Sequence, residues 1–119
     1  MIKPHVRAII AATAISHATG KKLTSIYQYG GDSGHKSISV DISGTKVTGY
    51  DYTTSSHFTG SIPSLYHYGE GCHVEFKDKG SGKYSGYVYG VGAHFEVTVR
   101  QKSASFFDYS GGGWTEFST

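Results

Sequence analysis

The chain is short of cysteine, of proline and of charge. Its 119 residues include one cysteine and two prolines, and charged residues make up 17% of it. The single thiol, Cys72, excludes an internal disulfide framework and a zinc module built from several cysteines. The formal net charge of +2 is too small to indicate a nucleic-acid partner by itself. The absence of cysteine pairs favours a reducing compartment, so we expect a cytoplasmic protein.

Long apolar runs and reaction motifs are missing as well. No stretch reaches the roughly 18 apolar residues that a membrane-spanning helix needs, so we expect no membrane partner. The chain has no nucleophile elbow, no phosphate-binding loop and no paired metal-ligand motif. It therefore predicts no catalytic residue, no metal ligand and no cofactor, and an enzyme is the less favoured class.

Residues 3–20 are the one stretch in which apolar side chains recur at helical spacing. Pro4 suits the first turn of a helix, and Gly20 suits the left-handed residue that follows the last turn. The sequence predicts an amphipathic helix of about three to four turns that packs on a sheet. The apolar positions are Val6, Ile9, Ile10, Ala14 and Ile15.

A secretory signal is the alternative interpretation of this stretch, and it would make the protein secreted. Lys3 and Arg7 would form the charged region, residues 8–15 the apolar core and residues 16–18 a small-x-small cleavage site. The apolar core is short and is interrupted by Thr13, which favours the retained helix.

Glycine and tyrosine are abundant, with 17 and 10 residues, and they follow a repeat. The pattern Ser/Thr-x-aromatic-x-Tyr occurs five times, and each copy is followed by small residues and then by histidine or tryptophan. The copies lie at 25–29, 48–52, 64–68, 85–89 and 105–109, and the following aromatic residues are His35, His57, His73, His94 and Trp114.

This spacing predicts five β-hairpins in series. The turns would be the two-residue pairs at 54–55, 70–71, 91–92 and 111–112, which place Tyr52 opposite His57 and Tyr89 opposite His94. The fold class is α+β in one domain, 1–119. The helix packs on the apolar face of an antiparallel meander of about eight to ten strands over 23–119, which curls into a half-barrel or closes into a barrel.

Alternation along each strand sorts the side chains onto two faces. The aromatic face is the predicted binding face, and its residues are Tyr27, Tyr29, His35, Tyr50, Tyr52, His57, Tyr66, Tyr68, His73, Tyr87, Tyr89, His94, Phe107, Tyr109 and Trp114. The predicted core face carries Ile26, Ile38, Val40, Ile42, Val47, Phe58, Ile62, Leu65, Val74, Phe76, Val88, Phe95, Val97, Val99, Phe106 and Phe117.

The aromatic face predicts a small non-enzymatic binding or assembly domain that contacts a protein partner or itself, since tyrosine and tryptophan dominate protein interfaces. A carbohydrate or a single-stranded nucleic acid, bound by stacking, is the alternative. Glu75, Glu96 and Glu116 share this face and would repel a phosphate backbone, which makes nucleic acid the weaker of the two. A further alternative is that dimerisation or barrel closure buries the face, which then serves packing alone.

The histidines offer a second class, a metal-binding or acid–base enzyme. Equivalent positions on successive hairpins lie about 10 Å apart, whereas metal ligands lie about 2 Å from one ion, so cross-strand pairing with tyrosine is the favoured interpretation. His67, Asp51 and Asp108 lie on the core face near the turns, where burial would perturb their pKa values. Aspartates at such places more often bind the turn backbone. Cys72 is expected to be partly exposed.

Overall fold

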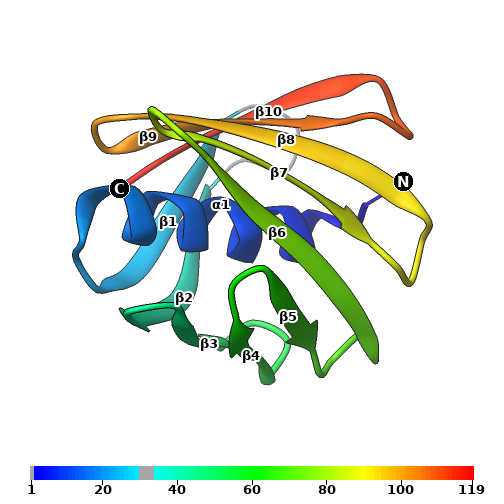
Figure 1. The fold of residues 1–119 in the computed structure, drawn as a ribbon, viewed down its shortest axis with the longest axis horizontal. Coiled ribbons are helices and arrows are strands. Elements are labelled where there is room, and N and C mark those ends of the chain that lie inside the picture. The colour runs from blue at the N-terminus through cyan, green and yellow to red at the C-terminus, as the bar shows by residue number, and fades with distance from the viewer. Residues whose placement is uncertain (1, 30–33) are drawn as a thin grey trace.

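Ten antiparallel strands close into a barrel around one central helix (Figure 1). The computed structural model describes residues 2–29 and 34–119. Each strand pairs with the next along the chain, and β1 pairs with β10 to close the barrel. The α+β class, the helix, the meander and the closed barrel are thereby confirmed. The loop of the first predicted hairpin includes residues 30–33, which lie outside the described residues.

The helix α1 spans Pro4–Thr19. The strands are β1 (Leu23–Tyr29), β2 (Gly34–Ser43), β3 (Lys46–Asp51), β4 (Ser56–Ser61), β5 (Ser64–His67), β6 (Cys72–Gly80), β7 (Lys83–Val88), β8 (Ala93–Arg100), β9 (Ser103–Asp108) and β10 (Gly113–Ser118).

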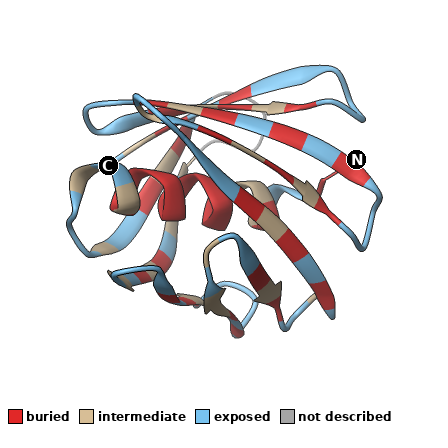
Figure 2. Ribbon diagram, viewed as in Figure 1, coloured by how far each residue is buried: buried red, intermediate tan, exposed pale blue. Residues whose placement is uncertain are grey.

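The helix is buried on all sides, so the prediction of an amphipathic helix is wrong. Every residue from Ala8 to Ser16 is buried, as the continuous red of α1 in Figure 2 shows. The less apolar side of the helix, which carries alanine, serine and threonine, is buried as well, because the barrel wall surrounds the helix. The hydroxyl of Thr13 donates to the carbonyl of Ile9 at 2.7 Å, which satisfies it inside the core. In this structure the segment proposed as a secretory signal supplies the centre of the core.

The five hairpins are confirmed, but their predicted register is wrong by two residues. His57 lies opposite Tyr50 and not Tyr52, and His94 lies opposite Tyr87 and not Tyr89. The four hairpin loops that the structure describes contain four residues rather than two, and the last residue of each has a positive φ, 63° at Gly92. Both loop lengths are even, so the correction leaves the two predicted faces unchanged.

The predicted core face lines the inside of the barrel. Its residues pack around the helix, with Ile42 and Ile62 only partly buried and the others buried. Among the residues that the structure describes, no helix has the length and apolar character needed to cross a membrane.

The two ends of the barrel differ. The four described hairpin loops, 52–55, 68–71, 89–92 and 109–112, and the start of α1 lie at one end, which we call the loop end. The short turns between hairpins and the last turn of α1 lie at the other, the turn end, where His17 Nδ1 and Tyr84 Oη are 2.8 Å apart. All of the repeated aromatic residues lie toward the loop end.

Candidate functional site

Each hairpin carries three aromatic side chains in contact with one another on the outer face of the barrel. In the hairpin of β7 and β8, Tyr87 lies in the middle, with ring centroids 4.9 Å from Tyr89 and 4.6 Å from His94, both edge-on. His94 is the cross-strand partner of Tyr87, and Tyr89 is the first residue of the loop. Edge-on aromatic pairs contribute about 0.5–1.5 kcal/mol beyond the area that they bury, so each group of three is assembled before any partner arrives.

The same arrangement recurs in the other four hairpins, with centroid separations of 4.7–4.8 Å. Four groups are Tyr–Tyr–His, and the last is Phe–Tyr–Trp. We call the whole set the aromatic collar. It comprises Tyr27, Tyr29 and His35; Tyr50, Tyr52 and His57; Tyr66, Tyr68 and His73; Tyr87, Tyr89 and His94; and Phe107, Tyr109 and Trp114. The structure thus places every predicted binding-face residue on the outer wall near the loop end.

The collar holds most of the exposed large hydrophobic side chains of the described residues. The second tyrosine of each group is between 52% and 61% exposed, and Trp114 is 62% exposed. Together with Val91, in the loop between β7 and β8, these are the exposed large hydrophobic side chains of residues 2–29 and 34–119. The middle aromatic residue of each group is half-buried. Barrel closure therefore leaves the aromatic face outside, in contact with solvent.

Some second tyrosines reach across to the neighbouring hairpin. Tyr109 Oη donates to Glu96 Oε1 at 2.6 Å, and Tyr29 Oη lies 2.9 Å from the hydroxyl of Ser118. The hydrogen bond to Glu96 raises the pKa of Tyr109. These contacts link each of the two rings to a strand of the neighbouring hairpin, across the line where two hairpins meet.

Several depressions lie along these lines, and three of them share a set of three side chains. Each of the three is lined by a histidine or tryptophan of a returning strand, by the glutamate two residues later, and by the second tyrosine of the next hairpin. Basic side chains also line two of them, Lys77 and Lys79 beside His94, and Arg100 beside Trp114. We call them seam sites. They are His73–Glu75–Tyr89 (about 360 Å³), His94–Glu96–Tyr109 (about 500 Å³) and Trp114–Glu116–Tyr29 (about 470 Å³).

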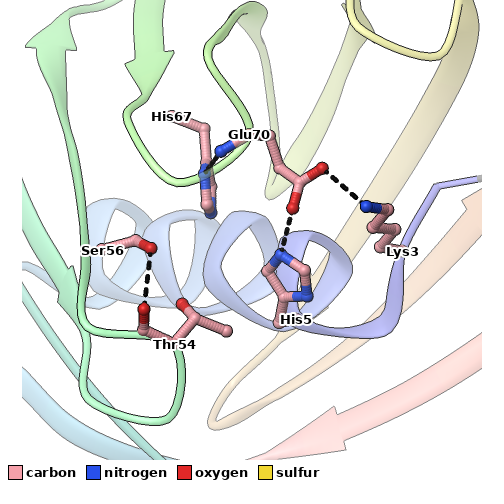
Figure 3. A network of polar contacts seen from close by, with 6 residues as sticks. All are labelled: Lys3, His5, Thr54, Ser56, His67 and Glu70. Atoms are coloured by element: carbon pink, nitrogen blue, oxygen red, sulfur yellow. Dashed lines mark hydrogen bonds and ion pairs between the residues drawn. The ribbon is translucent and has the colours of Figure 1, made fainter.

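A separate polar cluster lies where the loop end meets the first turn of α1 (Figure 3). The Glu70 carboxylate accepts a hydrogen bond from His5 Nε2 at 2.8 Å and lies 3.1 Å from Lys3 Nζ. The backbone N–H of Glu70 donates to His67 Nδ1 at 3.1 Å. Partial burial acts to raise the pKa of Glu70, but the bonds from Lys3 and His5 outweigh it and lower that pKa. The cluster fastens the loop after β5 to the start of the helix.

Counting partners within residues 2–29 and 34–119, two buried atoms in this region have none for a hydrogen bond: Nε2 of His67 and Oδ2 of Asp51. Because His67 Nδ1 accepts a bond, its Nε2 carries the proton in the neutral imidazole. Burial, with a smaller effect of the nearby His5, lowers the pKa of His67 and keeps it neutral. His67 is fully buried, so a substrate reaches it only if the loops move.

The two aspartates bind the loop backbone, as expected for aspartates near turns. Asp51 Oδ1 accepts from the backbone N–H of Thr53 at 2.9 Å. Asp108 accepts from the backbone N–H groups of Ile2 at 2.8 Å and Ser110 at 2.9 Å. Burial opposes ionisation of Asp108, yet the hydrogen bond from the Ser110 hydroxyl, at 2.6 Å, and these backbone bonds lower its pKa. Asp108 therefore ties the start of the chain to the last hairpin loop.

Sequence reasoning missed several polar residues near the loop end that make long-range contacts or are buried. Lys3 and His5 join Glu70 across more than 60 residues, and no local pattern signals that contact. Gln28 had a signal, because it occupies the inward position of the repeat that Asp51 and Asp108 also hold, and it is buried. The position of Gln28 in the repeat, rather than its residue type, is the signal that predicts its burial.

The geometry of the described residues gives no support to a metal site or to a reactive thiol. Within residues 2–29 and 34–119, no group of three or more His, Cys, Asp or Glu side chains is arranged to hold a metal ion. Cys72 is buried opposite His67 on the inner face, so its predicted partial exposure is wrong. The strand alternation that points His67 inward does the same to Cys72.

Comparisons of the chain with protein-family models, with curated proteins and with solved structures find no match.

Proposed function

We propose that the protein is a non-catalytic binding module that holds its partner against the aromatic collar. The observation that carries this proposal is the gathering of the exposed large hydrophobic side chains in one band near one end of the barrel. Exposed apolar surface of this kind is typical of interaction sites.

The architecture supports this function because it separates stability from binding. The core is made by the inner face of the strands and the helix, which together bury the aliphatic residues and five phenylalanines. The second tyrosines and Trp114 lie outside that core, so they are available to a partner without unfolding the barrel. Their edge-on packing restricts the side chains in advance, which lowers the entropy lost when a partner binds.

The proposal is tested by NMR on the isotopically labelled full chain. Spectra are recorded at rising protein concentration, and then with three probes: xylan, an arginine-rich peptide and an oligothymidylate. The expected result is that protein concentration or at least one probe shifts resonances of collar residues. Resonances of the turn end, such as those of Lys46 and Lys83, serve as the internal control. Shifts confined to other surfaces, or no shifts, would overturn the proposal.

Light scattering separates self-association from binding of a different molecule. A second copy of the chain would raise the measured mass and would shift collar resonances as concentration rises. A monomer whose collar resonances respond to one probe would show that the partner is of the probe's class.

A further inference from the structure

Taking the proposed function as its basis, we infer that the ligand of the collar is a carbohydrate and that the three seam sites are the places where sugar rings bind. The seam sites offer the same three groups in each case: an exposed tyrosine, a glutamate, and an imidazole or indole. This recurrence is the observation on which the inference stands.

The chemistry of each seam site matches the two sides of a sugar ring. The C–H groups on one face of a pyranose are apolar and pack on aromatic rings such as Tyr109 or Trp114. Its hydroxyl groups need acceptors, and a carboxylate offers two oxygen atoms for them. At the second seam site Glu96 supplies that carboxylate directly beside Tyr109, with which it is already hydrogen-bonded at 2.6 Å.

The carboxylates are oriented before a ligand arrives. Ser105 Oγ donates to Glu116 Oε1 at 2.9 Å and also to Oε2. Glu116 lies directly opposite Tyr29 at the seam that closes the barrel. An acid fixed against an exposed aromatic ring gives a small mixed surface with its hydrogen-bonding groups in place.

Shape favours a saccharide over the other partner classes. Charge does not discriminate by itself, because each seam site has a glutamate while Lys77 and Lys79 also line the second site and Arg100 the third. The closed barrel is convex, so the three sites face different directions. One flat protein surface cannot cover them together. A chain of repeated sugar units can follow the wall from site to site, because equivalent positions on neighbouring hairpins are only about 10 Å apart.

The two remaining seams provide internal controls, since they keep the tyrosine and lack the acid. Ser37 follows His35 at the seam with Tyr52, and Thr59 follows His57 at the seam with Tyr68. A hydroxyl group replaces the carboxylate at both. Tyr52 is as exposed as Tyr89, at 59% against 58%, so it is a matched control for loss of a collar tyrosine.

The first experiment is affinity electrophoresis of the full chain through gels that contain xylan, hydroxyethylcellulose, glycol chitin or pullulan. We expect at least one of these neutral polysaccharides to retard the protein. The variant Tyr109→Ala should lower the apparent affinity by roughly two- to tenfold, which is the value of one aromatic contact. Tyr52→Ala, at a seam that lacks the carboxylate, should lower the affinity by less than Tyr109→Ala does, and Lys46→Ala, at the turn end, should leave it unchanged. A larger loss is expected for the triple variant Tyr29→Ala/Tyr89→Ala/Tyr109→Ala, because avidity between sites is removed.

The second experiment uses the single tryptophan of the chain. Trp114 belongs to the third seam site alone, so its fluorescence reports binding there. Titration with an oligosaccharide cut from the retarding polysaccharide should change the emission. Glu116→Gln should weaken that response more than Glu75→Gln does, because Glu75 belongs to another seam site.

Each result bears on the inference. Retardation by none of the polysaccharides overturns it, and so does an equal loss of affinity in Tyr52→Ala and Tyr109→Ala. If the peptide or self-association shifts collar resonances while all four polysaccharides fail, the carbohydrate inference is wrong and the binding module stands. If no probe and no concentration change shifts the collar, both are wrong.

Discussion

Truncation of Phe95 and of Tyr89 tests whether the stability of the fold comes from the interior of the barrel while the outer collar contributes little. Phe95 is 1% exposed, faces the helix and stacks on Phe106 with centroids 5.4 Å apart and an interplanar angle of 15°. Removing a buried phenylalanine side chain costs about 3–5 kcal/mol, because contacts are lost and a cavity remains. We therefore expect Phe95→Ala to lower the free energy of unfolding by that amount.

Tyr89 gives the contrasting case. Its side chain is 58% exposed, and its principal packing partner is Tyr87, edge-on at 4.9 Å. Loss of one such aromatic contact costs about 0.5–1.5 kcal/mol. We expect Tyr89→Ala to destabilise the protein by that smaller amount, and Tyr89→Phe to change its stability less still.

Urea denaturation, followed by far-ultraviolet circular dichroism, measures both variants. With a urea dependence of about 1–3 kcal/mol per molar, the two midpoints should differ by roughly 0.5 M or more. Similar large losses for both substitutions would refute the reasoning, since they would show that the collar is covered in the native assembly. The experiment should be run at two protein concentrations, because a covering second copy would make the Tyr89→Ala loss depend on concentration.

Three further outcomes are expected. The pKa of His67 is lowered in the folded state, so the unfolded chain binds more protons below pH 6.5; the free energy of unfolding should fall as the pH drops from 7 to 5, and His67→Gln should flatten that slope in urea titrations at each pH. Burial, with Asp78 nearby, raises the pKa of Tyr84 to about 12; stability should therefore be lost as the pH rises above 10, and Tyr84→Phe should remove that loss when thermal unfolding is followed at alkaline pH. Ala12 is fully buried in a helix that the barrel surrounds, so Ala12→Leu should destabilise by about 1–3 kcal/mol through overpacking, a loss absent from Ala18→Leu at the exposed end of the helix in the same denaturation assay.

The repeat predicted the fold because side chains alternate between the two faces of a strand. An error of two residues in the loop length therefore leaves each residue on its predicted face. The predicted two-residue turns and the observed four-residue loops both keep Tyr50, Tyr52 and His57 on one face, so the inside and outside of the barrel were correct while the register was not. A glycine that ends a loop, such as Gly92, suits either loop length, and the sequence held nothing to choose between them.

Other features depend on contacts that local patterns do not encode. Alanine and serine in α1 looked like a less apolar side of the helix, and only barrel closure showed that they too are enclosed. The seam sites need the same global information. Glu116 and Tyr29 are far apart in the chain, and they meet because β10 pairs with β1.

Barrel closure also bears on whether the collar tyrosines serve packing or ligand binding. With the helix and the inner faces forming the core, the second tyrosines are not needed to fill it. If they served only to hold neighbouring hairpins together, the polar residue beside them would have no reason to differ between seams. Three seams carry glutamate, and two carry Ser37 or Thr59 beside an equally exposed tyrosine. A role confined to packing predicts similar effects of tyrosine loss at all five seams, whereas ligand binding through a fixed carboxylate predicts that loss matters for affinity at three of them. The comparison of Tyr52→Ala with Tyr109→Ala therefore decides between the two roles, because the fold supplies both kinds of seam in one molecule.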